Sequence, residues 1–549
     1  MLATNPIGVP VGPVPDLLDA SVRKHGARTA LNFMGRTWTY AKLGALVDAA
    51  AAGLQKMGVG KGTKVGLCLP NTPYSVIFFF AVLKAGGTVV NYSPLYVERE
   101  LLHQIRDSGT TIMVVPDLKQ IHGRVAAVAD AAGLKSIIVC PMIGILPWLK
   151  GLGFWLLKRS EMADYDPADG RHVEFAQVAR EGRRPAPVTV DPTTDIAVLQ
   201  YTGGTTGVPK GAELTHANVT ANAAQVRDHV CVLREGVERV LGVLPLFHVF
   251  AMTNVMNIPL SLGCEVVLVP RFNLKDLIAT IEKQRPTIFP GVPTIFAAIN
   301  NCPGIRKEQL SSLRLGVSGG APLPAEVRAR FEALTGCKLV EGYGLSETSP
   351  VLTANPPMGV IKDGSVGTAL PGTVIEIRDL NDPHRILGIG ERGEVCARGP
   401  QVMRGYWNNP QATQQAFIDG AFRTGDVGYL DEDGYLFLVD RIKDVILCGG
   451  YNVYPRIIEE ALYLHPAVAE AVAIGIPDPY RGQAPKAFVT LREGQTATSE
   501  DLAQFLAGQL SKIELPKQVE IRDSLPKTLV GKLSKKELVE EEARKAQTS

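Results

Sequence analysis

The stretch Tyr201-Thr-Gly-Gly-Thr-Thr-Gly-Val-Pro-Lys-Gly211 is the most informative part of this chain. It follows a short apolar run, Ile196–Leu199, which predicts a buried strand. Glycines let the backbone approach a ligand closely, and threonine hydroxyls with free backbone N–H groups can cradle phosphate oxygens. The lysine adds a mobile positive charge. The stretch therefore has the chemistry that a nucleoside triphosphate requires, although an ordinary hairpin turn would also fit its composition.

The same stretch is not a P-loop, because that motif runs from Gly-Lys-Ser/Thr directly into a helix. Here Pro209 precedes Lys210, and Gly211-Ala-Glu-Leu214 predicts a second short strand. We expect a helix to begin only after Thr215. The stretch is thus predicted to connect two strands.

Length and composition favour a globular protein with more than one domain. The chain has 549 residues, 46% of them hydrophobic, and a formal net charge of +2. A charge so close to zero gives no indication of nucleic-acid binding. The eight cysteines are scattered without a C-x-x-C pair, which predicts reduced thiols, disfavours a zinc site and fits a cytoplasmic protein.

One apolar segment, 141–159, bears on membrane contact. The N-terminus lacks the pattern of a signal peptide, and no apolar run is long enough to predict a membrane span. Segment 141–159, however, contains Trp148 and Trp155 with basic residues interleaved, and a proline and two glycines disfavour a long helix. It could touch anionic lipid as a peripheral patch, or pack as an apolar loop on its own domain.

Alternating strand and helix patterns predict βαβ units and parallel sheets in the first part of the chain. Residues 64–69 and 88–91 have strand patterns on either side of a helical pattern at 75–85. From about 367 to 440, short strands separated by Gly/Asp turns indicate a smaller β-rich subdomain. Residues 441–549 show a mixed α+β pattern, and we expect the last dozen residues to fray.

Two further motifs carry groups that suit a nucleotide and its metal. In Glu341-Gly-Tyr-Gly-Leu-Ser-Glu-Thr348, a tyrosine beside glycines can stack on a purine, and Glu347 offers a hard oxygen ligand for Mg²⁺. In Thr424-Gly-Asp426, a carboxylate could accept both ribose hydroxyls. On these residues alone, a solvated glutamate and a plain Gly-Asp turn remain the simpler explanations.

In the order in which they occur, from Thr202 to Lys532, these motifs resemble those of the acyl-adenylate-forming superfamily. That superfamily includes acyl-CoA synthetases, peptide-synthetase adenylation domains and beetle luciferases. The details are most similar to bacterial long-chain fatty acyl-CoA synthetases, among them Gly203 where many relatives have serine, and the apolar segment with its tryptophans. The resemblance implies an α/β fold. A large N-terminal adenylation domain, 1–440, would carry two parallel-type sheets and the β-rich subdomain, and 441–549 would form a mobile α+β lid.

The resemblance also implies a role for individual residues. The expected ATP- and AMP-binding residues are Thr202, Gly203, Gly204, Thr205, Thr206, Gly207, Lys210, Gly320, Ala321, Gly342, Tyr343, Gly344, Asp426 and Arg441. The expected catalytic residues are Lys532, Glu347, Thr202 and Lys210, with Glu347 as the metal ligand. The expected acyl-binding residues are His248, Gly319, Gly320 and Gly344. The CoA channel is expected to involve Gly449, Gly450 and Tyr451, with Lys443 as the hinge.

Some of these residues have simpler explanations without the resemblance. His248, between two apolar residues, would be a packed core histidine, and Gly449-Gly450 would be a turn. Lys532 stands in a lysine-rich tail of mostly solvated charges, and only the Pro-Lys-x-x-x-Gly-Lys spacing distinguishes it. A carboxylate that attacks the α-phosphate needs no general base, but it needs positive charge in the transition state, which Lys532 could supply.

The implied function is ATP-dependent activation of a long-chain or medium-chain fatty acid to acyl-AMP and then to acyl-CoA, with release of AMP and pyrophosphate. The implied ligands are the fatty acid, ATP, Mg²⁺ and coenzyme A, and the pattern leaves a homodimer open. The alternatives are a fatty acyl-AMP ligase that delivers to a carrier protein, an aryl- or medium-chain acyl-CoA synthetase, and a degenerate lipid-binding scaffold. A luciferase-like oxidase is disfavoured because Leu447 stands where those proteins have a lysine.

Overall fold

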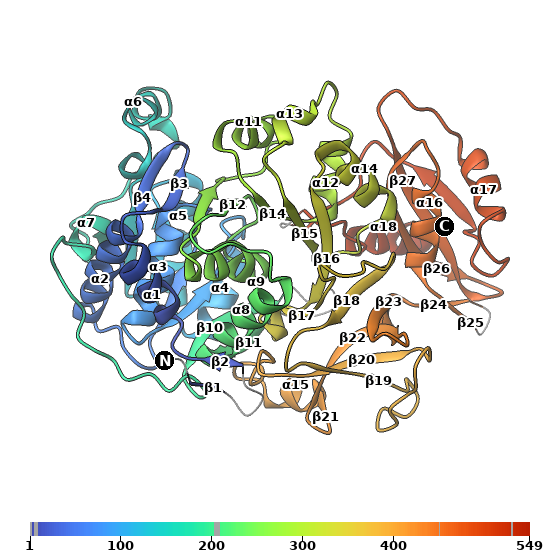
Figure 1. Ribbon diagram of the computed structural model, residues 1–549, viewed down its shortest axis with the longest axis horizontal. Coiled ribbons are helices and arrows are strands. Elements are labelled where there is room, and N and C mark those ends of the chain that lie inside the picture. The colour runs from blue at the N-terminus through green and yellow to red at the C-terminus, as the bar shows by residue number, and fades with distance from the viewer. Residues whose placement is uncertain (1–2, 5–8, 203–208, 449–450, 529–530, 549) are drawn as a thin grey trace.

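The computed structural model describes the chain except for residues 1–2, 5–8, 203–208, 449–450, 529–530 and 549. Its larger part contains two extended sheets with helices packed on them, and a smaller part with a separate sheet follows at the C-terminal end (Figure 1). The arrangement confirms the predicted α/β class, with a large N-terminal sheet domain and a smaller C-terminal domain.

The first sheet has the predicted strand–loop–strand stretch at one edge. Its strand order is β11-β10-β6-β5-β7-β8-β9, and every pairing is parallel except that of β10 with β11. Strands β6 and β7 are buried along their whole length, as is typical of parallel strands covered on both faces. The strands are β5 (Lys64–Leu67), β6 (Thr88–Asn91), β7 (Ile112–Pro116), β8 (Ser136–Cys140), β9 (His172–Glu174), β10 (Ile196–Thr202) and β11 (Lys210–Thr215).

Helix α3 (Pro73–Lys84), predicted over 75–85, lies between the two large sheets. Every residue from Pro73 to Leu83 is buried, and a helix that is apolar on all sides belongs inside a protein. Its side chains share one core cluster with strands of both sheets. The other helices of this region are α1 (Pro15–His25), α2 (Tyr40–Lys56), α4 (Glu98–Ser108), α5 (Lys119–Ala132), α6 (Trp148–Leu157) and α7 (Phe175–Val178).

The second sheet is longer and changes character along its width. Its order is β19-β20-β22-β23-β18-β17-β16-β15-β14-β12-β13-β3-β4, with β21 paired to β22. The strands from β3 and β13 to β16 are parallel, whereas the pairings from β16 to β19 are antiparallel. The β-rich segment is therefore joined to this sheet by hydrogen bonds, while a small apolar cluster of its own fills its interior.

The strands of the second sheet are β3 (Thr29–Phe33), β4 (Arg36–Thr39), β12 (Arg239–Gly242), β13 (Glu265–Leu268), β14 (Ile288–Gly291), β15 (Leu315–Gly319), β16 (Lys338–Gly344), β17 (Val351–Ala354), β18 (Ser365–Ala369), β19 (Val374–Arg378), β20 (Gly393–Arg398), β21 (Phe417–Ile418), β22 (Ala421–Leu430) and β23 (Tyr435–Arg441). The helices of this region are α8 (His216–Val230), α9 (Val249–Ala251), α10 (Ile258–Ser261), α11 (Leu274–Gln284), α12 (Pro293–Asn300), α13 (Lys307–Leu310), α14 (Ala325–Thr335) and α15 (Pro410–Gln415).

Helix α8 begins directly after Thr215, as predicted. The Asn218 amide donates to the Thr215 hydroxyl at 3.2 Å, which satisfies one of the free N–H groups of the first turn. The Asn218 side chain in turn accepts from the Thr215 amide at 2.8 Å, so the pair forms a capping box. The end of β11 and the start of α8 are thereby fixed together.

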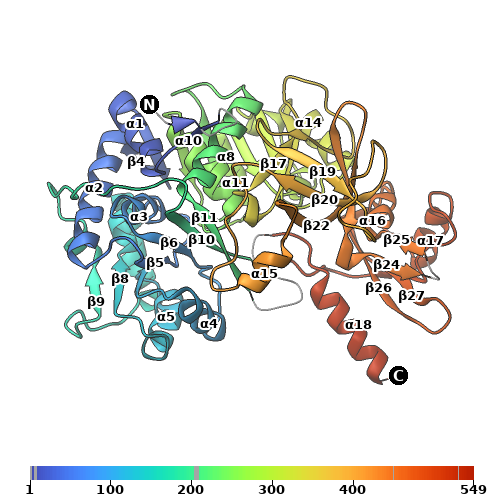
Figure 2. The same cartoon turned by 90° about the horizontal axis from the view of Figure 1, so that it is seen from below.

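The C-terminal part is built on one five-stranded sheet. Its strands are β24 (Ile446–Cys448), β25 (Tyr451–Val453), β26 (Val468–Asp478), β27 (Gly482–Leu491) and β28 (Gln518–Ile521), and its helices are α16 (Pro455–Tyr463), α17 (Ser499–Ala507) and α18 (Lys536–Thr548). The expectation of a frayed C-terminus was wrong, since α18 runs to Thr548 (Figure 2). Buried Leu538 and the ion pair of Glu542 with Lys486 at 2.9 Å hold that helix on the sheet.

Helix α6 lies at the surface and carries the unusual apolar segment. It is ten residues long, starts after Pro147, and stands out at the edge of the larger part (Figure 1). Trp148 is 75% exposed and Trp155 is 47% exposed, and the leucines of the helix are exposed with them. Among the described residues, no helix is long and apolar enough to cross a bilayer.

Candidate active site

Most of the predicted site residues line one cavity of about 1100 Å³. It lies at the carboxyl ends of β15 and β16, beside β22 and β23, and Thr528, Lys532 and Leu533 line it from the C-terminal part. The predicted residues on its wall are Thr202, His248, Gly319, Gly320, Ala321, Gly342, Tyr343, Gly344, Glu347, Asp426, Arg441, Lys443 and Lys532. Lys210 and Tyr451 are not on this wall. The predicted residues Gly203, Gly204, Thr205, Thr206, Gly207, Gly449 and Gly450 lie outside the described residues.

Tyr343, Asp426 and Arg441 form one bonded group on the wall. The Tyr343 hydroxyl donates to Asp426 Oδ2 at 2.6 Å, and Arg441 Nε lies 3.0 Å from Asp426 Oδ1. Strand pairing fixes the group, because Asp426 on β22 stands opposite Arg441 on β23. Burial raises the pKa of the Asp426 carboxyl, and the nearby guanidinium opposes that shift. The sheet itself therefore holds an acceptor for ligand hydroxyls in position.

Glu347 and Lys210 are linked through Tyr406. The Tyr406 hydroxyl donates to Glu347 Oε1 at 2.8 Å, and the Lys210 ammonium lies 5.1 Å from the centre of the Tyr406 ring, within cation–π range. Glu347 belongs to the short helix η4 (Ser346–Thr348), which packs against β10 and β11. Its burial raises the pKa of its carboxyl. A buried carboxylate thus stands beside strands β10 and β11.

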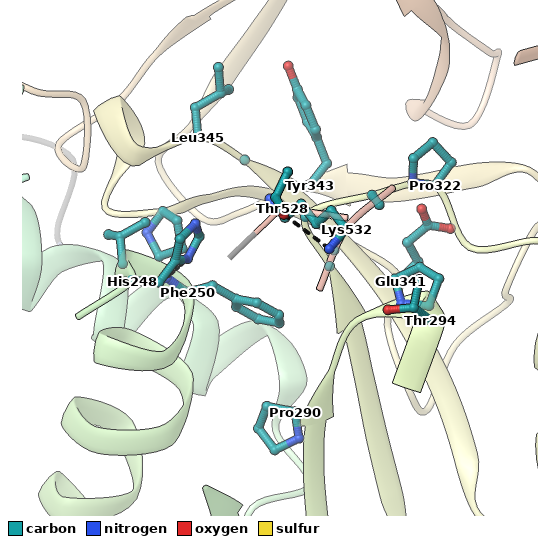
Figure 3. Close-up of a pocket in the computed structure, with 18 of the residues that line it drawn as sticks. His248, Phe250, Pro290, Thr294, Pro322, Glu341, Tyr343, Leu345, Thr528 and Lys532 are labelled. Atoms are coloured by element: carbon teal, nitrogen blue, oxygen red, sulfur yellow. Dashed lines mark hydrogen bonds between the residues drawn. The ribbon is translucent and has the colours of Figure 1, made fainter. Parts of the chain in front are cut away.

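Lys532 enters the cavity from the C-terminal part (Figure 3). The Lys532 amide donates to the Thr528 hydroxyl at 3.1 Å, and the Thr528 amide donates back to the Lys532 carbonyl at 2.7 Å. From the larger part, the Thr294 hydroxyl donates to the Gly531 carbonyl at 2.6 Å. Burial lowers the pKa of Lys532 to about 8. The ammonium is therefore still mainly protonated at pH 7, but it titrates within the range of enzyme assays.

Gly320 provides the space that the Lys532 side chain occupies. Its φ is +80°, a backbone conformation that favours glycine, and a β-carbon built on Gly320 would lie 2.7 Å from Lys532 Nζ. Any side chain at this position would both strain the turn after β15 and displace the lysine.

His248 lies on the opposite side of the cavity from Glu341, with Lys532 between them (Figure 3). The Phe250 amide donates to His248 Nδ1 at 3.2 Å, which assigns the ring proton to Nε2. Burial, and then the charge of Lys532, lower the pKa of His248 to about 3. At pH 7 the ring is therefore neutral, and it offers the cavity an N–H donor without a charge.

Beyond His248 the cavity continues as an apolar tunnel between α8 and the second sheet. Val226 and Val230, one helical turn apart on α8, line one side. Leu315, Val317 and Gly319 are alternate residues of β15, so they share one face of the strand and line the other side. A slot of this kind accommodates a hydrocarbon chain better than a polar ligand.

The C-terminal part contributes its residues unequally. Lys443, on the 3₁₀ turn Ile442–Asp444, reaches the cavity wall, and burial lowers its pKa. Tyr451 lies on the β24–β25 hairpin and is 65% exposed. In this arrangement Lys532 is in the cavity, whereas the predicted CoA residue Tyr451 is not.

Three residues of the site were not selected from the sequence. Glu341 is buried, accepts a hydrogen bond from the Leu323 amide at 3.1 Å, and has its pKa raised to about 7 by burial. Tyr406 follows a glycine, the same local signal that selected Tyr343, so a wider search for that signal could have found it. Thr294 carries no such signal, because its partner lies 237 residues further along the chain.

Sequence comparison places the chain in a family. The model of the AMP-binding enzyme family matches residues 18–407, and that of the AMP-binding enzyme C-terminal domain matches residues 457–532. A long-chain-fatty-acid–CoA ligase of Bacillus subtilis is 42% identical over 533 residues, which cover 96% of this chain and 94% of that protein.

Solved structures of similar proteins share the whole fold. The ATP-bound MatB of Rhodopseudomonas palustris has a TM-score of 0.84 and 29% identity, covering 96% of this chain and 98% of that one. An anthranilate CoA ligase in complex with anthranoyl-AMP has a TM-score of 0.84 and 26% identity, with 98% of both chains covered.

The fold and the mixed polar and apolar cavity are those of an α/β enzyme that handles a nucleotide together with an organic acid. The chain belongs to the AMP-binding enzyme family.

Proposed function

We propose that this protein is an AMP-forming ligase that converts a long-chain fatty acid and coenzyme A into acyl-CoA through an acyl-AMP intermediate. The observation that carries the proposal is a single cavity in which a polar pocket, with its bonded Asp426 and Arg441, opens into an apolar tunnel. A nucleotide fits the first part and a fatty acyl chain the second. The similarity to long-chain-fatty-acid–CoA ligases supports the same substrate class.

In the first half-reaction, each part of the wall would hold one part of the substrates. Tyr343 would stack on adenine next to Gly342 and Gly344, and Asp426 with Arg441 would bind the ribose hydroxyls. Thr202 and Lys210, with the loop 203–207, would bind the phosphates. His248 and Gly319 would flank the acid, together with Gly320 and Ala321. Lys532 would then stabilise the charge that develops as the carboxylate attacks the α-phosphate.

Glu347 fits a Mg²⁺ ion that accompanies ATP. Its carboxylate is a hard oxygen donor. Burial raises the pKa of this carboxyl, which indicates that nearby positive charges of the protein do not fully offset the cost of burying its negative charge. A divalent cation would neutralise phosphate charge at this position. The Tyr406 hydroxyl holds the carboxylate in orientation.

For the second half-reaction, we propose that 441–549 act as a lid on the adenylation domain 1–440. Rotation about Lys443 would leave Arg441, which precedes the hinge, paired with Asp426 on β22. It would withdraw Lys532 and bring the β24–β25 hairpin, with Gly449, Gly450 and Tyr451, to the cavity for the CoA thiol. The exposure of Tyr451 supports two orientations of the lid, because Tyr451 does not line the cavity when Lys532 is inserted in it.

We further propose a cytoplasmic enzyme that touches anionic membrane through α6. The exposed apolar surface of α6 includes Trp148 and Trp155, and Lys150, Lys158 and Arg159 lie beside it, so both an apolar and a basic contact are available. Such a contact suits an acid that partitions into lipid. Cosedimentation with phosphatidylglycerol vesicles should fall when both tryptophans become alanine. It should stay unchanged for Tyr480→Ala, a fully exposed residue of the C-terminal part, and equal binding by all three proteins would refute the contact.

The test of the main proposal is pyrophosphate release with ATP and Mg²⁺, with octanoate, palmitate, oleate or benzoate, each with and without CoA. Turnover with palmitate or oleate that depends on CoA supports the long-chain ligase. Release without CoA would indicate an acyl-AMP ligase, which needs a carrier protein. A preference for benzoate would indicate an aryl-CoA ligase, an alternative that the similarity to an anthranilate CoA ligase favours. No release with any acid would favour a scaffold. Sedimentation of the same sample tests for a homodimer.

A further inference from the structure

A group of polar residues lies at the far end of the apolar tunnel, where three parallel strands begin. Strands β12, β14 and β15 run in the same direction, so their amino ends lie at one edge of the sheet. The residues immediately before them are Glu238, Thr287 and Arg314. Glu238 is itself on the cavity wall, next to the tunnel residues Leu233 and Val240.

These residues converge on the Glu238 carboxylate. Arg234 Nε donates to it at 2.7 Å, Arg314 Nη1 at 2.6 Å and the Thr287 hydroxyl at 2.5 Å. The Glu238 side chain is 0% exposed, whereas those of Arg234 and Arg314 are 53% and 43% exposed. The carboxylate is thus enclosed while the guanidinium groups face solvent, so the group lies between the tunnel and solvent. We call these four residues the end wall.

The distance to the end wall can be estimated from strand geometry. Leu315 and Gly319 are four residues apart on β15, which corresponds to about 13 Å at the usual strand rise. An extended chain advances about 1.2 Å per bond, so this part of the tunnel holds roughly eleven carbon–carbon bonds. The carboxyl end and the first carbons of an acid would lie before Gly319, near His248 and Lys532.

We propose that the end wall sets the upper limit of acyl chain length, with Glu238 as the residue that determines it. This inference rests on the proposed fatty acid ligase function. A chain that ends before the wall gains from every buried methylene. A longer chain must insert its terminal methyl group into a buried ion pair. Disrupting such a pair without replacing its partners costs binding free energy.

The experiment is a profile of kcat/KM for CoA-dependent pyrophosphate release over saturated acids from eight to twenty-two carbons. For the unmodified protein we expect a plateau and then a fall of about tenfold or more for each pair of carbons beyond the limit, since one methylene already changes discrimination by about tenfold or more. In Glu238→Ala, the two arginines lose their shared partner and can turn to solvent, so the limit should move up by at least two carbons.

The matched control is Glu265→Ala. Glu265 begins β13 at the same edge and pairs with Arg239 at 2.8 Å, but it is not on the cavity wall, so its profile should keep the original limit. Val230→Phe should move the limit to shorter acids, because it narrows the tunnel before the wall. If Glu238→Ala does not fold, Arg314→Ala removes a more exposed member and should shift the limit in the same direction by a smaller amount.

The inference would be overturned if Glu238→Ala lost activity uniformly toward all acids and kept the chain-length limit of the unmodified protein. The same result in Arg314→Ala would overturn it where Glu238→Ala does not fold. Either result would show that the end wall is only structural. That result differs from failure of the proposed function, in which the unmodified protein itself would release no pyrophosphate with any acid.

Discussion

The two halves of the candidate site are held in different ways. The group of Tyr343, Asp426 and Arg441 stands on paired strands of one sheet, so its geometry is part of the fold. Lys532, by contrast, comes from the C-terminal part. The loop that carries it meets the larger part through the Thr294 hydroxyl and the Gly531 carbonyl. We call the group of Tyr343, Asp426 and Arg441 the nucleoside half and Lys532 the lysine half. The difference suggests that the nucleoside half serves both half-reactions, whereas the lysine half is in the cavity during only one of them.

The largest expected effect is that of Lys532→Ala on adenylation. Lys532 is the positively charged side chain that the lid would bring to the phosphate as negative charge develops there. Its loss should lower the single-turnover rate of pyrophosphate release by about 10²- to 10³-fold. ATP affinity should change little, because the nucleoside half is untouched. Lys512→Ala, an exposed lysine of the same part, is the control and should be unaffected. A loss below tenfold would remove Lys532 from its assigned role.

A change in the fixed half should act differently. In Asp426→Ala, the bonds to Tyr343 and Arg441 and the expected bonds to ribose are lost, so KM for ATP should rise by about tenfold to a hundredfold. Binding of supplied acyl-AMP should weaken by a similar factor, since the intermediate keeps the ribose. Isothermal titration with AMP measures the same loss directly, and an unchanged affinity would contradict the assignment.

The pH dependence of adenylation should report the buried lysine. Burial lowers the pKa of Lys532 to about 8, and only the protonated form carries the required charge. The adenylation rate should therefore fall about tenfold per pH unit above pH 8. Arginine does not titrate in this range, so the residual activity of Lys532→Arg should lack that fall. If the fall persists in the variant, another group is responsible.

The smallest expected effect concerns the contact between the two parts. Thr294→Val removes the hydrogen bond to the Gly531 carbonyl, which is worth about 1 kcal/mol, or roughly fivefold in the population of the arrangement with Lys532 inserted. Adenylation should slow by that factor at most, while thioester formation from supplied acyl-AMP should be equal or faster. Thr280→Val is the control, because this half-buried threonine on α11 donates only within its own helix, to the Asp276 carbonyl at 2.7 Å. Slowing of both steps to the same extent would argue against a shift between two lid positions.

The sequence predicted those features that depend on local pattern. The start of α8 after Thr215 and the strands around α3 follow from periodicity and turn chemistry, and the wall residues from Thr202 to Lys532 follow from motifs that resemble those of a known family. Features that depend on distant contacts were not predicted. The end wall joins positions 238, 287 and 314, and no local pattern marks that meeting. The glycine before Tyr406 could have pointed to that residue, but not to its contacts with Lys210 and Glu347. The ordered α18 was missed for the same reason, because its partners lie on the other elements of the C-terminal part.

The most direct test of the account compares thioester formation by Lys532→Ala and Asp426→Ala from chemically supplied palmitoyl-AMP and CoA. If one half of the site is fixed and the other is delivered for adenylation alone, Lys532→Ala should form palmitoyl-CoA at nearly the rate of the unmodified protein, and Asp426→Ala should be impaired at subsaturating palmitoyl-AMP. Equal impairment of this step in both variants would contradict the account.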